Sequence, residues 1–297
     1  MMTPTLFSVS YAGLWGQHKL GLCDFIKKAA ELGYPAVMLM AKRPHLSVVD
    51  ITDETLAEIR DVAKKHKVEI STIAAYTDFT GGKAMEVPWV EMQIAYVRTL
   101  ARIAKALGAK IVRVFTGYTT DTESYQRDWD KCVGAIRECA AAAEEYGVIL
   151  GVQNHHDVGV AFESYAELLD EVDHPNCKAM FDPWSPALQG YDLKPCARAM
   201  APRMVQTTFA DYLKFPRFVH VAGLVNYRPI TDMVRAVPIG DGFIDYEGFF
   251  AGLKEGGFSG YVAYEMCSPL RGGSSLENLD KTAKLSLERI RAFIGKK

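Results

Sequence analysis

This 297-residue sequence has few of the features that direct a protein to membranes, to export or to nucleic acids. Residues 1–9 lack the basic segment and cleavage site of a signal peptide, and no stretch approaches the ~20 apolar residues that span a bilayer. Lys and Arg total 34 against 36 Asp and Glu, and no basic block offers a nucleic-acid groove. We expect a cytoplasmic protein with a small-molecule substrate and with neither a membrane nor a nucleic-acid partner.

Paired cysteines and a glycine-rich phosphate loop are also missing. The six cysteines are scattered without a Cys-x-x-Cys pair, and nothing places the chain in an oxidising compartment, so free and mostly buried thiols are expected. No glycine-rich fingerprint follows the first apolar strand, which disfavours an open dinucleotide-binding sheet.

The sequence does contain a repeated join between a helix, a glycine and a short apolar strand. Gly33, Gly108, Gly147 and Gly257 each end a helical segment and precede a strand such as 111–115. Glycine in the left-handed conformation is a common helix stop, and strands that are apolar throughout are typical of a parallel sheet buried on both faces. The join therefore predicts helices alternating with parallel strands.

Eight strands fit this rhythm, each followed by a helix or by space for one: residues 6–10, 36–40, 68–75, 111–115, 149–155, 178–182, 204–210 and 260–265. About 37 residues per unit suits a (β/α)8 barrel, and we predict a single α/β TIM-barrel domain over residues 1–297. The longest irregular stretch is predicted at about 211–245, between the seventh strand and its helix. A loop this long is usually functional, and it would overhang the carboxyl ends of the strands, where barrel active sites lie.

Polar side chains fall at the ends of the last four strands. Alternation along each strand points Gln153 and His155 inward on the fifth, places Asp182 at the end of the sixth, and sends Glu265 to the mouth on the eighth. Two carboxylates, an imidazole and amide or hydroxyl oxygens suit Mn²⁺ or Mg²⁺ better than a thiolate-preferring metal. The predicted metal ligands are Gln153, Asp182, Gln206 and Glu265, and structural hydrogen bonds at the barrel rim are the alternative.

The order of these strand ends resembles that of the xylose isomerase-like TIM barrels, which include sugar-phosphate isomerases, ketose epimerases and hydroxypyruvate isomerases. The resemblance covers essentially the whole chain and is sharpest at IGDGFIDY (239–246), GYVAYE (260–265) and SSLENL (274–279). It implies a metal held by Glu, Asp, His and Glu from strands five to eight. Asp182 and Glu265 match this set in type and position.

Two positions depart from the set that the resemblance implies. Gln153 stands in place of the strand-five Glu, and Gln206, or Thr208 after a small register shift, stands in place of the strand-seven His. An amide oxygen still binds Mn²⁺ or Mg²⁺, but the site carries one fewer negative charge, so the metal affinity should fall.

The loss of the strand-five Glu also changes the expected proton transfer. In the epimerases that the chain resembles, two glutamates face each other as acid and base, and Gln153 cannot exchange a proton at neutral pH. We predict that His155, two residues further on the same face, is the base and that Glu265 is the second catalytic residue. A ligand role or a structural role for His155 stays open.

These residues predict a divalent-metal-dependent carbohydrate enzyme that abstracts a proton next to a sugar carbonyl, as an isomerase or epimerase of a ketose or keto-sugar. Residues 152–156 and 181–186 are similar to a branch that cleaves 3-keto C-glycosides, which implies a β-eliminating lyase with His155 as base and often a small second subunit. A sugar-binding barrel without catalysis is the third interpretation. A homo-oligomer and a second subunit are both open.

Four further residues are predicted to bind the sugar or glycoside. Trp15 lies in the loop after the first strand, and Trp184 directly follows Asp182, so both can stack on a sugar face. Asp211 matches a family aspartate after the seventh strand, and Arg271 follows Glu265 by six residues. Loop packing or solvent exposure is the alternative for each.

Overall fold

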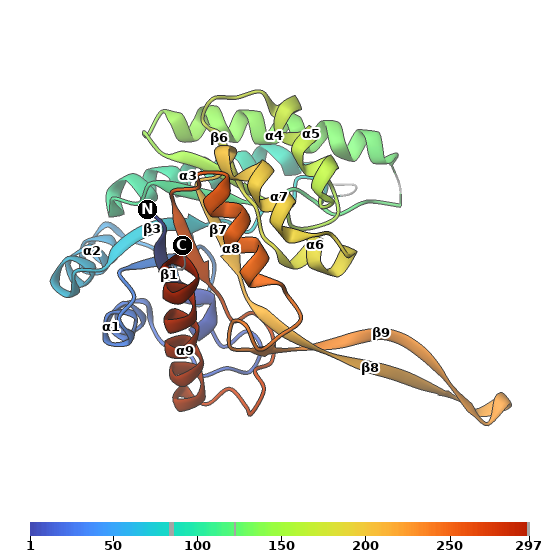
Figure 1. The fold of residues 1–297 in the computed structure, drawn as a ribbon. Helices are drawn as coiled ribbons and strands as arrows, with labels where there is room; N and C mark the ends of the chain where they lie inside the picture. The colour runs from blue at the N-terminus through green and yellow to red at the C-terminus, as the bar shows by residue number, and fades with distance from the viewer. Residues whose placement is uncertain (83–85, 122, 296–297) are drawn as a thin grey trace.

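A closed barrel of eight parallel strands forms the centre of the molecule (Figure 1). The computed structural model describes residues 1–82, 86–121 and 123–295. Neighbouring strands follow the order β6-β5-β4-β3-β2-β1-β10-β7, and the Val205 amide donates to the Ala179 carbonyl at 3.1 Å, which closes β7 onto β6. The barrel strands are β1 (Thr3–Phe7), β2 (Ala36–Met40), β3 (Glu69–Ala74), β4 (Ile111–Val114), β5 (Ile149–Gln153), β6 (Cys177–Met180), β7 (Gln206–Phe209) and β10 (Tyr261–Tyr264).

Helices surround this barrel and follow its strands along the chain (Figure 1). Their apolar faces and the outward side chains of the strands, such as Leu150 and Val152, form the main core. The helices are α1 (Leu22–Leu32), α2 (Asp53–His66), α3 (Trp89–Leu107), α4 (Tyr125–Glu144), α5 (Phe162–Val172), α6 (Trp184–Gln189), α7 (Leu193–Met200), α8 (Tyr246–Glu255) and α9 (Leu276–Gly295).

The predicted (β/α)8 architecture is confirmed. The predicted strand 36–40 is observed with the same bounds, and the helices α1 and α3 end at Gly33 and Gly108 with φ of 89° and 75°, the left-handed region that glycine tolerates. The first strand is the least accurate prediction. It covers Thr3–Phe7 instead of residues 6–10, and residues 8–11 form a 3-10 turn.

A second, smaller core fills the inside of the barrel. It includes Phe7, Met38, Ile111 and Met180, which point inward from four different strands. These side chains plug the lower part of the barrel, so the space open to a ligand lies above them, at the carboxyl ends of the strands.

The stretch predicted as an irregular loop at about 211–245 has a different conformation. Its first part is a two-stranded antiparallel sheet of β8 (Asp211–Val221) and β9 (Asn226–Val237), which projects far from the barrel (Figure 1). The prolines that argue against strands are tolerated here: Pro216 lies at a shift in register, and Pro229 is in a strand that has one free edge. The prediction of an irregular segment was therefore wrong for residues 211–237.

Two smaller expectations concern cysteines and membranes. All six cysteines are free thiols, as predicted, and three of them are buried. Within the described parts of the chain, no helix combines the length and the apolar character needed to cross a membrane.

Candidate functional site

A cavity of about 420 Å³ opens at the carboxyl ends of the barrel strands. This volume lies within the range of small-molecule sites, which are commonly ~300–1,000 Å³. Every barrel strand contributes to its wall, through the strand end or the residues just after it. In strand order these residues include Val9, Lys42, Tyr76, Phe115, Gln153, Trp184, Tyr212 and Glu265.

Aromatic rings make up much of the cavity wall. Trp184 lies 6.2 Å from His155 and 5.5 Å from Tyr212, measured between ring centroids. Phe115 lies 4.5 Å from His155, and Trp15 lines the same cavity with 38% of its surface exposed. Rings of this kind stack on the apolar faces of sugars and on aromatic groups.

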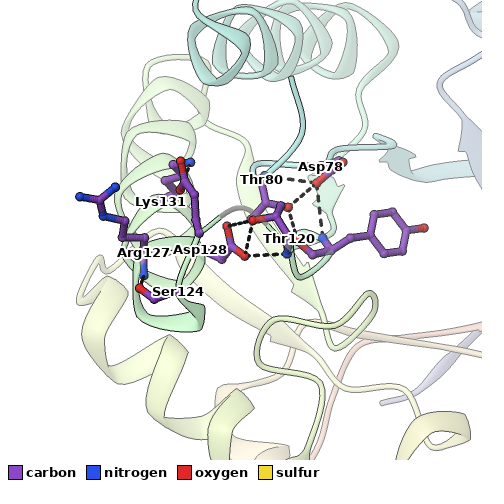
Figure 2. A network of polar contacts seen from close by, with 9 residues as sticks. Asp78, Thr80, Thr120, Ser124, Arg127, Asp128 and Lys131 are labelled. Carbon is purple, nitrogen blue, oxygen red and sulfur yellow. Dashed lines mark hydrogen bonds and ion pairs between the residues drawn. The ribbon is translucent and has the colours of Figure 1, made fainter. Parts of the chain in front are cut away.

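A loop network fixes another wall residue, Tyr118. The Tyr118 amide donates to Asp78 at 3.4 Å, and the Thr80 hydroxyl lies within hydrogen-bond distance of both Asp78 and the Tyr118 carbonyl (Figure 2). Asp128 on α4 accepts from the Thr120 amide at 2.9 Å and from the Thr120 hydroxyl (Figure 2). The loops after β3 and β4 are thus tied together, and Tyr118 stacks on His156 with 4.1 Å between ring centroids.

Gln153 joins two buried groups of opposite charge below this cavity. Its Oε1 accepts from Arg113 Nη1 at 3.2 Å, and its Nε2 donates to Asp182 Oδ2 at 2.8 Å. The other oxygen of Asp182 accepts from the Trp184 amide at 2.7 Å. The two charged partners fix the orientation of the Gln153 amide, because a guanidinium needs an acceptor and a carboxylate needs a donor.

Arg113 is the largest polar side chain buried in the barrel. It is 1% exposed, its guanidinium lies 3.7 Å from the Phe115 ring centroid, and its Nε and Nη2 make no hydrogen bond of normal geometry within the described chain. Burial lowers the pKa of Arg113, and its charge in turn lowers the pKa of Asp182 and of Glu265. Arg113 therefore supplies a fixed positive charge beneath the site.

Asp182 is buried and Glu265 is partly buried at the cavity wall, so a negative charge is costly on both. Burial, followed by the nearby charge of Glu265, raises the pKa of Asp182 to about 7. Burial also raises the pKa of Glu265, although Arg113 and Cys267 oppose this shift. Glu265 faces the cavity, and its raised pKa makes it a stronger base than an exposed carboxylate.

His155 faces the cavity as a neutral imidazole. Burial, and then the charges of His156 and Arg113, lowers the pKa of His155 to about 3. The His156 amide donates to His155 Nδ1 at 2.8 Å, so Nδ1 is an acceptor and the ring proton lies on Nε2. In this tautomer Nε2 can donate a hydrogen bond, and a base role for His155 through Nε2 would need the other tautomer.

The structure brings Gln153, Asp182 and Glu265 together but not Gln206. Gln206 is the first residue of β7, in register with Tyr261, whereas Glu265 lies four residues further along β10, or about 13 Å. Thr72 donates to Gln206 Oε1 at 2.5 Å inside the barrel. Thr208, the predicted alternative, is also fully buried and lies 3.9 Å from Met38 Sδ.

The four predicted substrate residues divide into two pairs. Trp15 and Trp184 line the cavity, whereas Asp211 and Arg271 do not appear in its wall. Asp211 is fully buried and accepts hydrogen bonds from backbone amides, and Arg271 is exposed beside a separate hollow.

Lys42 and Tyr76 are among the cavity residues that were not predicted from the sequence. Lys42 follows the end of β2, and its Nζ lies 3.8 Å from the centroid of the Tyr76 ring. Burial, and then the charge of Arg113, lowers the pKa of Lys42. Both residues lie two positions past a strand end, like Asp182 and Glu265 near theirs, but on the second and third strands instead of the last four.

Comparison with known proteins agrees with this geometry. A model of the family described as xylose isomerase-like TIM barrel matches residues 26–293. The chain belongs to the xylose isomerase-like TIM barrel family. This confirms the resemblance stated from the strand ends.

Individual relatives of this xylose isomerase-like barrel are distant in sequence. An inosose isomerase from Bacillus velezensis is 23% identical over 261 residues, which are 86% of each chain. The crystal structure of a probable 3-DHS dehydratase, AsbF, from Bacillus anthracis has a TM-score of 0.74 and 18% identity, covering 98% of this chain and 99% of that one. A crystal structure of the IOLI protein with a bound zinc atom has a TM-score of 0.74 and 17% identity, covering 99% and 98%.

In the part of the chain that the structure describes, His, Cys, Asp and Glu side chains alone do not form a metal site. No group of three or more His, Cys, Asp or Glu side chains is placed there to hold an ion. The oxygen atoms near the cavity that could bind a metal belong to the carboxylates of Asp182 and Glu265 and to the side-chain amide of Gln153.

Proposed function

We propose that this protein is an isomerase or epimerase that moves a proton on the carbon next to the carbonyl of a ketose or keto-sugar. The observation that carries the proposal is that Glu265, a partly buried carboxylate with a raised pKa, and the neutral imidazole of His155 line the same cavity. The inosose isomerase relative and the shared family support this class of chemistry.

The proton transfers follow from the protonation states of these two residues. Ionised Glu265 takes the proton from the carbon next to the carbonyl, and His155 Nε2–H donates a hydrogen bond to the carbonyl oxygen, which stabilises the resulting enediolate while His155 stays neutral. Protonated Glu265 returns the proton to the neighbouring carbon while the hydroxyl proton moves to the other enediolate oxygen, which interconverts ketose and aldose. Protonation of the original carbon by a water molecule on its opposite face, with the Glu265 proton released to solvent, gives the epimer. Gln153 takes no part in proton transfer, and it holds the Asp182 carboxylate in position.

A divalent cation, Mn²⁺ or Mg²⁺, is part of this proposal. Asp182 and Glu265 would supply two hard oxygen ligands, and because burial is the main cause of their raised pKa values, a bound cation would offset the cost of their negative charge there. Gln153 Oε1 has a second lone pair besides the one facing Arg113. The ion would polarise the substrate carbonyl. Gln206 is left out of this set because it lies about four residues deeper in the barrel.

A second function, β-elimination from a 3-keto-glycoside, is favoured by the aromatic wall. Trp15, Tyr118 and Trp184 offer more ring surface than a monosaccharide needs, and they would also pack against an aromatic aglycone. The first step is the same removal of a proton next to the ketone, and the electron pair then expels the group on the next carbon. Ring surface at the cavity mouth also suits a role for Trp15 and Trp184 in substrate stacking.

Proton exchange in deuterated water tests the shared first step. The enzyme loaded with Mn²⁺ or Mg²⁺ is mixed with keto-sugars and 3-keto-glucosides, and NMR follows loss of the α-proton signal. Exchange with reversible interconversion supports the isomerase, and release of the aglycone supports the lyase. Glu265→Gln should reduce exchange at least about 100-fold, whereas the exposed control Glu91→Gln should not change it. Full exchange by Glu265→Gln would refute its role, and no exchange with any substrate would leave a binding protein.

A further inference from the structure

The β8–β9 hairpin has no support from the rest of the described chain along most of its length. We call residues 213–235 the arm. Tyr212 and Ala236 at its root are buried, but nearly every residue from Lys214 to Met233 is exposed. At ~3.3 Å per residue, each strand of the arm reaches about 30 Å from its root, and Figure 1 shows it extending away from the barrel.

An arm of this kind is not expected to be stable alone in water. A two-stranded hairpin is marginal unless a third strand or another packed element covers it. Its outer end also exposes large apolar side chains: Phe218 is 58% exposed, Tyr227 65% and Leu224 74%. Phe218 lies opposite Pro229 in the ladder, so apolar groups of both strands gather at the same end. Exposed apolar surface of this extent is typical of an interaction site.

The charge of the arm indicates what it contacts. It carries four basic side chains, Lys214, Arg217, Arg228 and Arg235, against one acidic side chain, Asp232, so its net charge is +3. The chain as a whole has a net charge of −2, which leaves −5 on the remaining residues. The arm is therefore complementary in charge to the body of this same protein.

The acidic side of the body includes an exposed face of α5. Glu163, Glu167 and Glu171 on that helix and Asp173 just after it are exposed, and Asp170 on the same helix pairs with Arg203 at 2.8 Å. The arm has 23 residues, and one side of a stable interface commonly has ~20–30. Its length and charge thus match what an interface with a second copy requires.

We propose that the arm is a dimerisation element that packs against the body of a second copy of this chain. Its apolar end contacts the second copy, and its basic side chains face the acidic surface of that body. A two-fold axis lets each copy offer its arm to the other, so both arms are covered in one closed assembly. Tyr212 and Val234 at the arm root line the cavity, so the interface also holds the rim of the site in place.

Sedimentation velocity of the full chain tests this proposal. Wild type should be a dimer at micromolar concentration, and 0.5 M NaCl should raise its dissociation constant at least about tenfold by screening the charges. The variant Phe218→Ser, Leu224→Ser, Tyr227→Ser should raise it at least about 100-fold, because apolar anchors dominate such interfaces. The control Val49→Ser, Val87→Ser, Leu188→Ser removes equally exposed apolar groups outside the arm and should change it less than about threefold.

Charge reversal separates the two parts of the interface. Arg217→Glu with Arg228→Glu leaves the apolar end intact and should also produce monomers. This double variant and the triple Ser variant should both keep the far-ultraviolet circular dichroism of wild type, which shows that they fold. A wild type that is monomeric at about 100 µM overturns the proposal and would leave the arm to a different protein. A wild-type dimer whose dissociation constant is unchanged in both arm variants overturns it as well.

Discussion

Replacement of Asp211 by alanine is expected to destabilise the fold and to leave substrate affinity unchanged. The carboxylate is fully buried and accepts hydrogen bonds from the amides of Tyr212, Gly240, Gly242 and Ile244 at 2.8–3.4 Å. These bonds fasten the start of β8 to the segment that leads into α8. A Cβ on Gly242 would overlap Asp211 Oδ1, so the segment packs directly on this carboxylate.

The cost follows from those four amides. A buried amide that loses its partner costs about 1–3 kcal/mol, but Gly240 is exposed, so water replaces part of what is lost there. Burial raises the pKa of Asp211, which means that the hydrogen bonds recover only part of the cost of burying its charge. We expect Asp211→Ala to lower the free energy of unfolding by about 3 kcal/mol and Asp211→Asn by about half of that.

Urea unfolding followed by circular dichroism measures this loss. At ~2–4 °C per kcal/mol for a protein of this size, the melting temperature should fall by about 6–12 °C. Asp241→Ala is the matched control, because Asp241 pairs with Arg289 on the surface and such a pair contributes about 0–1 kcal/mol. A loss below about 1 kcal/mol together with a raised KM would refute the structural role and support the substrate contact predicted from the sequence.

Three other predictions concern the site and a buried histidine. Arg113→Met should move the acidic limb of the pH–activity profile to higher pH, because the Arg113 charge lowers the pKa of Asp182 and of Glu265. Arg113→Lys keeps the charge and should leave the limb near its wild-type position. An acidic limb that does not move in the Met variant contradicts this prediction. Chelation with EDTA should abolish proton exchange, and adding back Mn²⁺ or Mg²⁺ should restore it. Calorimetry should find that the metal affinity is at least about tenfold weaker in Asp182→Asn and unchanged in Gln206→Ala. Equal losses in both variants would place Gln206 at the metal after all. Burial lowers the pKa of His45 to about 4 from ~6.5 in the unfolded chain, so the unfolded state binds the extra proton and stability falls as the pH drops from about 6.5 toward 4. His45→Gln should flatten that decline in urea unfolding, and an equally steep decline would exclude His45 as its source.

The sequence predicted the barrel because its local patterns agree with its global fold. Glycines such as Gly33 stop helices by conformational freedom alone, and strands such as Ala36–Met40 are apolar on both faces in any closed parallel barrel. The segment at residues 211–237 was mispredicted because its turn-forming residues and prolines are typical of a loop. An isolated two-stranded sheet has free edges, and these edges tolerate such residues.

The chemistry of the site was only partly predictable. Asp182 and Glu265 were found because a polar residue at the end of an apolar strand must face the barrel mouth, which depends on local alternation. The depth of Gln206 was not predictable in this way, because the register between β7 and β10 fixes it, and a difference of four residues moves a side chain from the cavity to the plugged interior.

The amino-acid sequence by itself determined where the helices and strands of the barrel form and which strand ends carry polar groups, since periodicity and glycine positions act over a few residues. The tertiary structure alone decided that Arg113 lies beneath Gln153, that Gln153 donates to Asp182, and that amides from residues 240–244 surround Asp211. Those contacts join residues whose packing depends on strand register and on burial. Both are set by the closure of the whole barrel.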